Sequence, residues 1–351
     1  MATVILTGGG TAGHCTPNLA LIPYLKNHFD NIYYFGSEQG IEKTLVKKAG
    51  VEYFTIPSIG LKRKLTFKNL KIPFVLVSGI NKAKTLLKKL KPDVIFSKGG
   101  YVALPTVIAG HKLGIPVIAH ESDLTVGLTN RISAKYCNAV LTSFPETAKT
   151  VKNGRYVGSP IRRELSLATY NIGLKFFNLK GDKPVLLVFG GSLGATSINA
   201  LLRKSLDLLL PKYDIIHIVG KNNINRAINK AGYYQFEYID KMAYAYAVSS
   251  VCLTRAGANT VFELLSLNKP SVLIPLSKSA SRGDQMENAE YFAKKGLIYQ
   301  LVGDISPEQL SLMIDSAYTN RENIIANIKR RNIGDKSKEI ADIIAYYVKR
   351  Q

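Results

Sequence analysis

The sequence predicts an α/β protein of two doubly wound domains, each with a parallel sheet covered by helices on both faces. Short apolar runs alternate with longer amphipathic segments along the chain, a pattern typical of parallel sheets with helical crossovers. A glycine-rich loop follows the opening strand of each of two such series, and a length of 351 residues suits two domains. Such domains bind ligands at the carboxyl ends of their strands.

The expected strands fall into two series separated by a linker around VGSPIRRE, residues 157–164. The first series comprises Val4–Leu6, Ile32–Phe35, Val94–Phe96, Val117–Ala119 and Ala139–Leu141, and the second comprises Val185–Phe189, Ile215–Val219, Val251–Leu253 and Ser271–Ile274. We therefore expect domains over residues 1–160 and 161–335. Residues 336–351 read as an amphipathic helix that can pack on either domain, including back on the first.

The chain carries 47 Lys and Arg against 25 Asp and Glu, a formal net charge of +22. This excess predicts a polyanionic partner, which could be nucleic acid, an anionic membrane surface or a phosphorylated substrate. The scattered cysteines Cys15, Cys137 and Cys252 predict a reducing compartment, without a disulfide framework or a zinc site. Because the chain shows no signal-peptide pattern and no apolar run of about 18 residues, we expect a cytoplasmic protein, dissolved or lying on a membrane.

The first glycine-rich loop, TGGGTAGH at residues 7–14, contains the G-x-G-x-x-G spacing of dinucleotide-binding proteins. Two features argue against that use. Thr16-Pro17 predicts a helix that starts after His14 with Thr16 as its N-cap, and only Glu38 stands where a carboxylate would hold a ribose. We therefore expect a longer loop with His14 at its lip. His14 is either a structural histidine or a neutral imidazole acting as general base or substrate anchor.

Three segments of the second half suit a nucleotide-sugar site. FGGSLGATSIN, residues 189–199, places bare backbone amides before a helix, which suits phosphate. In RAGANTVFELL, residues 255–265, Glu263 either closes a capping box with Thr260 or accepts the hydroxyls of a ribose. Gln285 suits a sugar hydroxyl, unless its segment is simply a solvated loop. The chain has no D-x-D motif and no His/Asp cluster, so we expect chemistry without a metal.

Seven segments occur in order over nearly the whole chain: TGGGTAGH–TPNLAL, HESDLTVGLTN, VGSPIRRE, FGGSLGATSIN, EYIDKMAYAYA, RAGANTVFELL and DQMENA. Together they resemble the bacterial family of UDP-N-acetylglucosamine–N-acetylmuramyl-(pentapeptide) pyrophosphoryl-undecaprenol N-acetylglucosamine transferases. The resemblance implies a GT-B fold, in which two Rossmann-like domains face a cleft. It also implies inverting transfer of GlcNAc from the co-substrate UDP-GlcNAc to the C4 hydroxyl of MurNAc in lipid I, giving lipid II, with no cofactor.

By position, the resemblance assigns Thr11, Ala12 and Gly13 to the donor sugar or the acceptor phosphates. It assigns UDP-GlcNAc binding to Arg162, Ser192, the backbone of Ile239, Gln285, and the run Ala258, Asn259, Thr260, Val261, Phe262 and Glu263, with Glu263 on the ribose.

Three positions depart from the commonest pattern of the family: Ala12 replaces glycine, Leu193 replaces glutamine, and Asp123 replaces an asparagine that contacts sugar. Unlike asparagine, an ionised Asp123 accepts hydrogen bonds but cannot donate them. The acceptor hydroxyl needs a base, for which His14 is the first candidate and Asp123 the second.

The segment from Tyr53 to Pro92 is rich in lysine and contains no acidic residue. After Pro73, apolar residues recur at helical spacing and predict a helix whose stripe faces the core: Leu76, Ile80, Ala83, Leu87 and Leu90. Before it, apolar and basic residues mix without that periodicity, which predicts contact with an anionic bilayer. That membrane segment comprises Leu61, Lys62, Arg63, Lys64, Leu65, Phe67, Lys68, Leu70 and Lys71. We expect a peripheral protein on the cytoplasmic face of the cell membrane.

Three other functions fit parts of the sequence. A UDP-GlcNAc 2-epimerase would share the architecture and the donor, but would need neither an acceptor nor the membrane segment. A nucleic-acid-binding protein would explain the charge, yet the chain shows no helix-turn-helix, RNA-recognition or zinc pattern, so we expect no nucleic acid partner. A nicotinamide oxidoreductase would use the first loop, against which Thr16-Pro17 argues.

Overall fold

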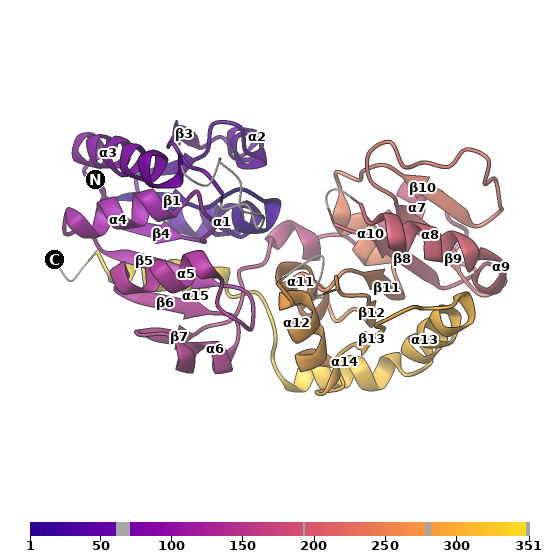
Figure 1. Cartoon of the computed structure of the whole chain (residues 1–351). Coiled ribbons are helices and arrows are strands. Elements are labelled where there is room, and N and C mark those ends of the chain that lie inside the picture. The colour runs from indigo at the N-terminus through magenta and orange to yellow at the C-terminus, as the bar shows by residue number, and fades with distance from the viewer. Residues whose placement is uncertain (61–70, 192–193, 278–281, 349–351) are drawn as a thin grey trace. The chain divides into compact units, whose positions relative to one another are not determined.

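The protein, described here from a computed structural model, divides into two compact units (Figure 1). The structure describes residues 1–60, 71–191, 194–277 and 282–348. Unit 1 holds residues 1–162 and the segment from 335 to the C-terminus, and unit 2 holds residues 163–334. The boundaries expected from the sequence, at 160 and 335, lie within one or two residues of these.

Unit 1 is built on a parallel sheet of seven strands in the order β3-β2-β1-β4-β5-β6-β7. Its strands are β1 (Thr3–Thr7), β2 (Asn31–Gly36), β3 (Glu52–Thr55), β4 (Val94–Ser97), β5 (Val117–Glu121), β6 (Ala139–Thr142) and β7 (Gly154–Tyr156). Side chains alternate across a strand, so Val4 and Leu6 enter one core and Ile5 enters the other. The strand order reverses between β1 and β4, where doubly wound sheets bind ligands.

Helices cover both faces of this sheet, as the alternating apolar runs predict. One face packs on α1 (Ala12–Leu25), α2 (Ile41–Lys48) and α15 (Ser337–Tyr346). The other packs on α3 (Ile72–Leu90), α4 (Leu104–Lys112) and the 3₁₀ turn η2 (Ala134–Tyr136). Two short helices, α5 (Leu128–Ser133) and α6 (Pro145–Thr150), complete the unit.

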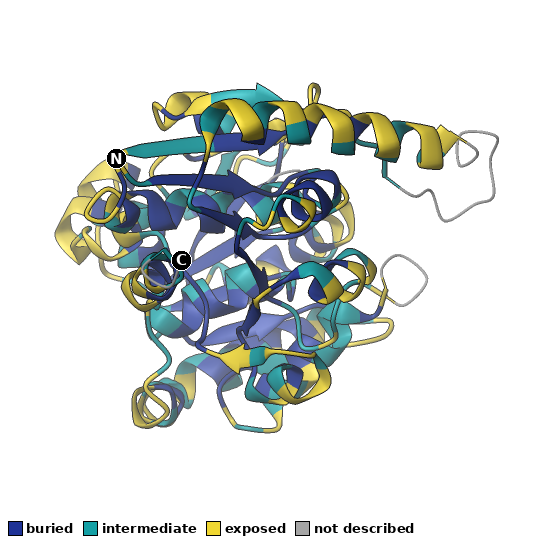
Figure 2. Cartoon of the chain, turned by 90° about the vertical axis from the view of Figure 1, so that its left-hand side faces the viewer, coloured by how far each residue is buried: buried dark blue, intermediate teal, exposed yellow. Residues whose placement is uncertain are grey.

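Helix α3 presents one narrow buried stripe and is otherwise exposed or half-buried along its length (Figure 2). Gly79, Ala83 and Leu87 are buried in it, and Ile80 and Leu90 pack beside them, so the expected core-facing stripe is confirmed from Ile80 onward. Leu76, its expected first member, is only half-buried. Gly79 allows a close approach, since a Cβ there would lie 2.3 Å from the carbonyl oxygen of Pro57. The residues 61–70 that precede the helix lie outside the described part of the chain.

The C-terminal helix packs on α1 within unit 1. His28 Nε2 lies 2.9 Å from Asp342 Oδ1, and the Tyr24 hydroxyl donates to Asp335 Oδ2 at 3.3 Å. Ile340, Ile343 and Ile344 are buried in the same core as β1. This contact explains why the terminal segment is amphipathic: its apolar stripe completes the first domain, although about 170 residues of unit 2 intervene in sequence.

Unit 2 repeats the architecture with a parallel sheet of six strands in the order β10-β9-β8-β11-β12-β13. Its strands are β8 (Val185–Phe189), β9 (Asp214–Ile218), β10 (Tyr233–Phe236), β11 (Val251–Thr254), β12 (Ser271–Leu273) and β13 (Tyr299–Gln300). Its helices are η3 (Arg163–Ser166), α7 (Tyr170–Phe177), α8 (Thr196–Lys204), α9 (Leu206–Leu209), α10 (Met242–Val248), α11 (Ala258–Ser266), α12 (Asp284–Ala293), α13 (Pro307–Thr319) and α14 (Arg321–Arg330). The order reverses between β8 and β11.

Every strand expected from the sequence is present, and four were missed: β3, β7, β10 and β13. These four are the edge strands of the two sheets. An edge strand lies partly in solvent and needs no continuous apolar run, so hydrophobic periodicity does not reveal it.

Among the described residues, no helix is both long and apolar enough to cross a bilayer.

Candidate functional site

The first glycine-rich loop leads from β1 into α1, which begins earlier than the sequence indicated. The helix starts at Ala12, with Thr11 in extended conformation before it. The expectation that Thr16 caps a helix starting after His14 is therefore wrong. The Thr16 hydroxyl instead donates to the carbonyl oxygen of Ala12 at 3.1 Å. The loop's own contacts set the helix start, and Pro17 is accommodated inside the helix.

A buried carboxylate, Glu42 on α2, holds this loop. Its Oε2 accepts the backbone N–H of Gly10 at 3.2 Å. Its Oε1 accepts the backbone N–H and the hydroxyl of Ser37, at 3.1 and 2.5 Å. Glu38, the carboxylate that the sequence offered for a ribose, is exposed. The carboxylate that contacts this loop is therefore Glu42, which holds the loop in place. Its spacing from the glycines in the sequence did not identify it.

Another loop of unit 1, Gly99-Gly100-Tyr101 after β4, closes over the first glycine-rich loop. A Cβ at Gly100 would lie 2.4 Å from the carbonyl oxygen of Gly9 and 3.3 Å from His14 Nδ1. Gly100 has a φ of +79°, so a side chain there would be strained as well as crowded. Tyr101 packs its ring against Gly10, where a Cβ would lie 2.5 Å from the ring. The two loops thus form one surface at the switch point of the unit 1 sheet.

His14 lies in the first turn of α1 on this surface and is partly exposed. Its Nδ1 lies 2.9 Å from the hydroxyl oxygen of Thr11. When Nδ1 carries the ring proton and donates it to Thr11, Nε2 is the basic nitrogen, which is the tautomer a general base needs. Thr11 and Gly13 are exposed beside it, so the first-turn amides of α1 lie at the surface, where helix N-termini attract anions.

A buried polar cluster lies next to these loops, at the ends of β4 and β5. The Lys98 ammonium lies 2.8 Å from His120 Nδ1 and donates to the Ser122 hydroxyl. His120 Nε2 lies 2.9 Å from the carbonyl oxygen of Gly158, so Nε2 donates and Nδ1 accepts from Lys98. Burial lowers the pKa of Lys98 to about 8, against the attraction of Glu121 and Asp123. Burial, and then the Lys98 cation, lower the pKa of His120 well below its usual value.

Asp123 lies on the turn that follows β5, which we call the Asp123 turn (residues 121–127). Glu121 shapes this turn: its Oε1 accepts the N–H of Asp123 at 3.0 Å, and its Oε2 accepts the N–H of Gly127 at 3.0 Å. Glu121 Oε2 also accepts the Asn130 amide at 2.9 Å. Unit 1 therefore carries both candidate bases at the carboxyl end of its sheet, His14 after β1 and Asp123 after β5.

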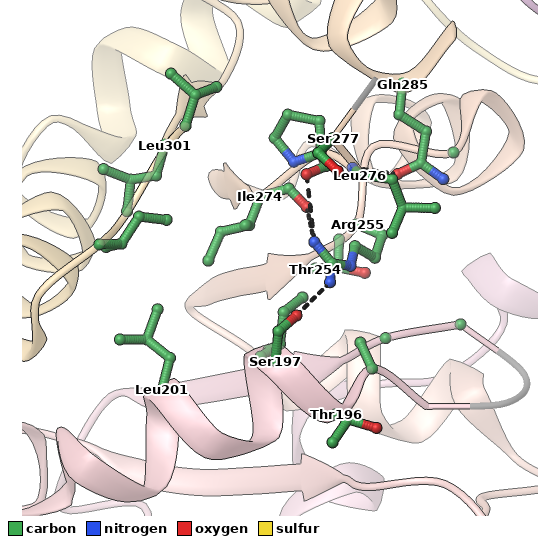
Figure 3. A pocket seen from close by; sticks show the side chains of 18 of the residues that line it. Thr196, Ser197, Leu201, Thr254, Arg255, Ile274, Leu276, Ser277, Gln285 and Leu301 are labelled. Atoms are coloured by element: carbon green, nitrogen blue, oxygen red, sulfur yellow. Dashed lines mark hydrogen bonds between the residues drawn. The ribbon is translucent and has the colours of Figure 1, made fainter. Parts of the chain in front are cut away.

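Unit 2 holds a pocket of about 1100 Å³ at the carboxyl ends of β8, β11 and β12 (Figure 3). The loop glycines Gly190, Gly191 and Gly194 line it, together with the first turn of α8. Gly194 has a φ of +76° and passes so close to Val219 that a Cβ would lie 2.3 Å from its carbonyl oxygen. Small residues in this loop therefore bring backbone amides and a helix N-terminus to the pocket, an arrangement that suits a phosphate.

Arg255 forms a wall of this pocket and was not singled out by the sequence. Its guanidinium donates to the carbonyl oxygens of Ile274 and Pro275 at 2.9 and 3.3 Å, and to the Ser197 hydroxyl at 2.5 Å (Figure 3). These contacts join the loop after β11, the loop after β12 and α8. Arg255 thus fixes three walls of the pocket and adds a positive charge beside the glycine loop.

Of the predicted donor-binding residues, Thr260 and Gln285 line this pocket. Gln285 Oε1 accepts the N–H of Leu276 at 3.1 Å, so a ligand would meet its amide NH₂, a donor. The capping box between Thr260 and Glu263 is absent, because α11 begins at Ala258 and has no side-chain cap. Glu263 instead accepts the Tyr246 hydroxyl at 3.3 Å. The capping alternative for Glu263 is therefore wrong.

The other predicted donor residues lie in different settings. Val261 and Phe262 point into the core of unit 2, where Phe262 packs edge-on against Phe292, so only their backbone could meet a ligand. Ile239 and Ala258 are also buried, whereas Asn259 and Arg162 are partly exposed. Ser192 lies outside the described residues, as does Leu193.

The described residues contain no group of three or more His, Cys, Asp or Glu side chains that could hold a metal ion. Metal-independent chemistry stays a prediction.

Two Rossmann-like parallel-sheet units, with a glycine-lined pocket in the second, form the GT-B fold. The chain superposes on the crystal structure of Acinetobacter baumannii MurG with a TM-score of 0.77 at 25% identity, covering 99% of this chain and 100% of that one. A glycosyltransferase of kitacinnamycin gives a TM-score of 0.77 at 15% identity, covering 99% of each chain, which supports the fold alone.

The chain belongs to glycosyltransferase family 28, whose N-terminal domain matches residues 4–142 and whose C-terminal domain matches residues 185–345. It is therefore a hexosyltransferase. Among its curated relatives, a protein of Clostridium botulinum strain 657 is 46% identical over 99% of this chain and 100% of its own. One of Lachnospira eligens is 44% identical over 98% of this chain and 99% of its own. Both are named UDP-N-acetylglucosamine–N-acetylmuramyl-(pentapeptide) pyrophosphoryl-undecaprenol N-acetylglucosamine transferase.

Proposed function

We propose that this protein transfers GlcNAc from UDP-GlcNAc to the C4 hydroxyl of MurNAc in lipid I, with inversion and without a metal ion, and so forms lipid II for peptidoglycan synthesis. The observation that carries the proposal is identity of 44–46% along essentially the whole chain with relatives that bear this transferase name. The glycine-lined pocket of unit 2 and the loop of unit 1 that carries His14 also support it.

The donor would bind unit 2 at the glycine-lined pocket. Departure of UDP leaves negative charge on the β-phosphate, and the amides of the first turn of α8 suit that anion. Arg162 would add a cation to the same leaving group. Gln285 would donate its amide NH₂ to a sugar hydroxyl, and the Glu263 carboxylate would accept from the ribose.

The acceptor would bind unit 1, with His14 as the first candidate for the base and Asp123 as the second. In the reaction the base takes the proton of the C4 hydroxyl as its oxygen attacks the anomeric carbon. The bond from that carbon to the phosphate oxygen breaks on the opposite face, which inverts the configuration. His14 is favoured because Thr11 can hold its Nδ1–H and leave Nε2 basic. Thr11, Ala12 and Gly13 would present first-turn amides to the acceptor phosphates.

The test is UDP release by the purified protein, with and without a lipid I analogue and with and without EDTA. We expect release that requires the analogue and resists EDTA. NMR of the product should show a β-linked GlcNAc on the C4 oxygen of MurNAc. If UDP-GlcNAc were consumed equally without acceptor, the 2-epimerase would replace the transferase. Loss of activity in EDTA, restored by a divalent ion, would overturn metal independence.

We also propose that the protein binds the cytoplasmic face of the membrane through the segment from Leu61 to Lys71. Apart from Lys71, this segment lies outside the described residues. The adjoining turns of α3 support the proposal, because Phe74 and Val77 are 78% and 57% exposed and follow the exposed Lys71 closely in sequence. Exposed apolar side chains among cations suit an anionic bilayer surface.

Charge reversal at Lys62, Arg63 and Lys64 should release the protein from phosphatidylglycerol vesicles in a sedimentation assay. The control reverses three exposed lysines elsewhere in unit 1, Lys47, Lys48 and Lys112, and changes net charge equally. If both triple variants are released from the vesicles to the same extent, the overall charge binds the vesicles and the segment has no special role. If the segment variant stays bound like the wild type, the segment is not the membrane contact.

A further inference from the structure

Lys98 is an enclosed cation in unit 1: its side chain is buried, it directly precedes Gly99 in the loop after β4, and it is not among the predicted substrate contacts. A buried charge is costly unless it is paired and hydrogen-bonded. Here the ammonium donates to His120 Nδ1 and to the Ser122 hydroxyl. Both partners belong to the end of β5 and the first residue beyond it, so the cation is fastened to the element that leads into the Asp123 turn.

Two carboxylates, Glu121 and Asp123, lie on that turn with one residue between them. Both attract the Lys98 ammonium. Glu121 is buried, and its carboxylate oxygens accept hydrogen bonds from two N–H groups of the turn and from the Asn130 amide. Like charges so close in a partly buried turn repel each other, and the Lys98 cation bound to Ser122 between them offsets that repulsion.

We propose that Lys98 is a positioning residue for glycosyl transfer: its cation balances Glu121 and Asp123 and, through Ser122, fixes the turn that presents Asp123 to the acceptor. This inference rests on the proposed function, because it assumes that the acceptor binds unit 1. Thr147 also contacts the same turn, by donating to the carbonyl oxygen of Leu124 at 2.6 Å. Lys98 thus holds the turn at Ser122, and Thr147 holds it at Leu124.

An electrostatic role makes a specific prediction about coupling. If the cation is needed because residue 123 is an anion, removing that anion should remove much of the need for the cation. Lys98→Met and Asp123→Asn should therefore not multiply their effects. If Lys98 had a purely structural role, Lys98→Met would instead lower kcat/KM by the same factor in either background. The free-energy effects of independent sites add.

The experiment is a double-mutant cycle at pH 7 with Lys98→Met, Asp123→Asn and the double variant, measuring kcat/KM for a lipid I analogue. We expect Lys98→Met alone to lower it about tenfold or more, since small displacements of a substrate-positioning group have effects of this size. In the Asp123→Asn background the same change should cost at least about fivefold less. The KM for UDP-GlcNAc should not change. Lys112→Met, which removes an exposed lysine of the same unit, is the matched control.

Lys98→Gln gives a second cycle in case the methionine variant fails to fold, because glutamine can still donate to Ser122 but carries no charge. Multiplicative losses in the cycle, or an equal rise in the KM for both substrates, would overturn the proposal. Wild-type protein that transfers no GlcNAc to the analogue would overturn the proposed function instead. The two failures are therefore distinguishable in one data set.

Discussion

Glu42→Gln should destabilise the loop that carries His14, because it removes a hydrogen bond that holds this loop. Glu42 is fully buried and accepts three hydrogen bonds, two from Ser37 on Oε1 and one from Gly10 on Oε2. The amide can keep its oxygen toward Ser37 but then turns its NH₂ toward the N–H of Gly10, donor against donor. A lost bond to a charged group is worth about 1.5–3 kcal/mol, and a buried donor without a partner costs about 1–3 kcal/mol. We expect a net loss of about 2–4 kcal/mol.

Differential scanning calorimetry measures this effect as a shift of the unit 1 transition. For a domain of this size, about 1 kcal/mol lowers the melting temperature by about 2–4 °C, so we expect a drop of about 5–15 °C. The transfer rate should fall about tenfold or more, because the loop carries His14. The matched control is Glu38→Gln, an exposed carboxylate near by, which should change neither quantity. A Glu42→Gln variant with wild-type melting and activity would refute the fastening of the loop by this carboxylate.

Three further predictions concern the two units. His14→Ala should lower kcat about 10²–10⁴-fold in the UDP-release assay, while His111→Ala, at an exposed site, should not; a loss under about tenfold would exclude His14 as the base. Gln285→Leu should raise the calorimetric Kd for UDP-GlcNAc about tenfold, with that for UDP less affected, because it removes the proposed sugar contact; equal weakening of both ligands would place Gln285 elsewhere. The pKa of Lys98 is lowered to about 8 in the folded protein, so the unfolded chain binds more protons at that site between pH 8 and about 10.4. The free energy of unfolding of the wild type, measured by urea titration, should therefore rise relative to that of Lys98→Met across this pH range. A constant difference between the two would contradict the lowered pKa.

Repeated hydrophobic patterns made much of the fold predictable. The buried strands of both sheets have both faces covered by helices, so each reads as a continuous apolar run. Both glycine-rich loops are also visible in the sequence, because the tight passages at Gly10 and Gly194 exclude other residues. The edge strands β3, β7, β10 and β13 were not predictable in this way, since half-exposed strands carry no such run.

The sites were predictable only in part, for a different physical reason. His14 was singled out because it lies in a glycine-rich loop that follows a strand, whereas Asp123 and the donor-binding run were assigned from the family resemblance of their segments. Their roles stay predictions. Glu42, Arg255 and Lys98 were missed because each acts on a segment distant in sequence. Glu42 reaches Gly10, Arg255 reaches Ser197 and the loop after β12, and Lys98 reaches the end of β5.

The sequence by itself determined the two α/β domains, their strand-ending loops and the transferase family, because these depend on local periodicity and on contiguous motifs. The tertiary structure alone decided where α1 begins, that the C-terminal helix completes unit 1, and which charges hold the loops. Those outcomes depend on buried hydrogen bonds between residues far apart in the chain. Such bonds are strong because water is excluded from them, and a linear pattern carries no record of which residues will meet there.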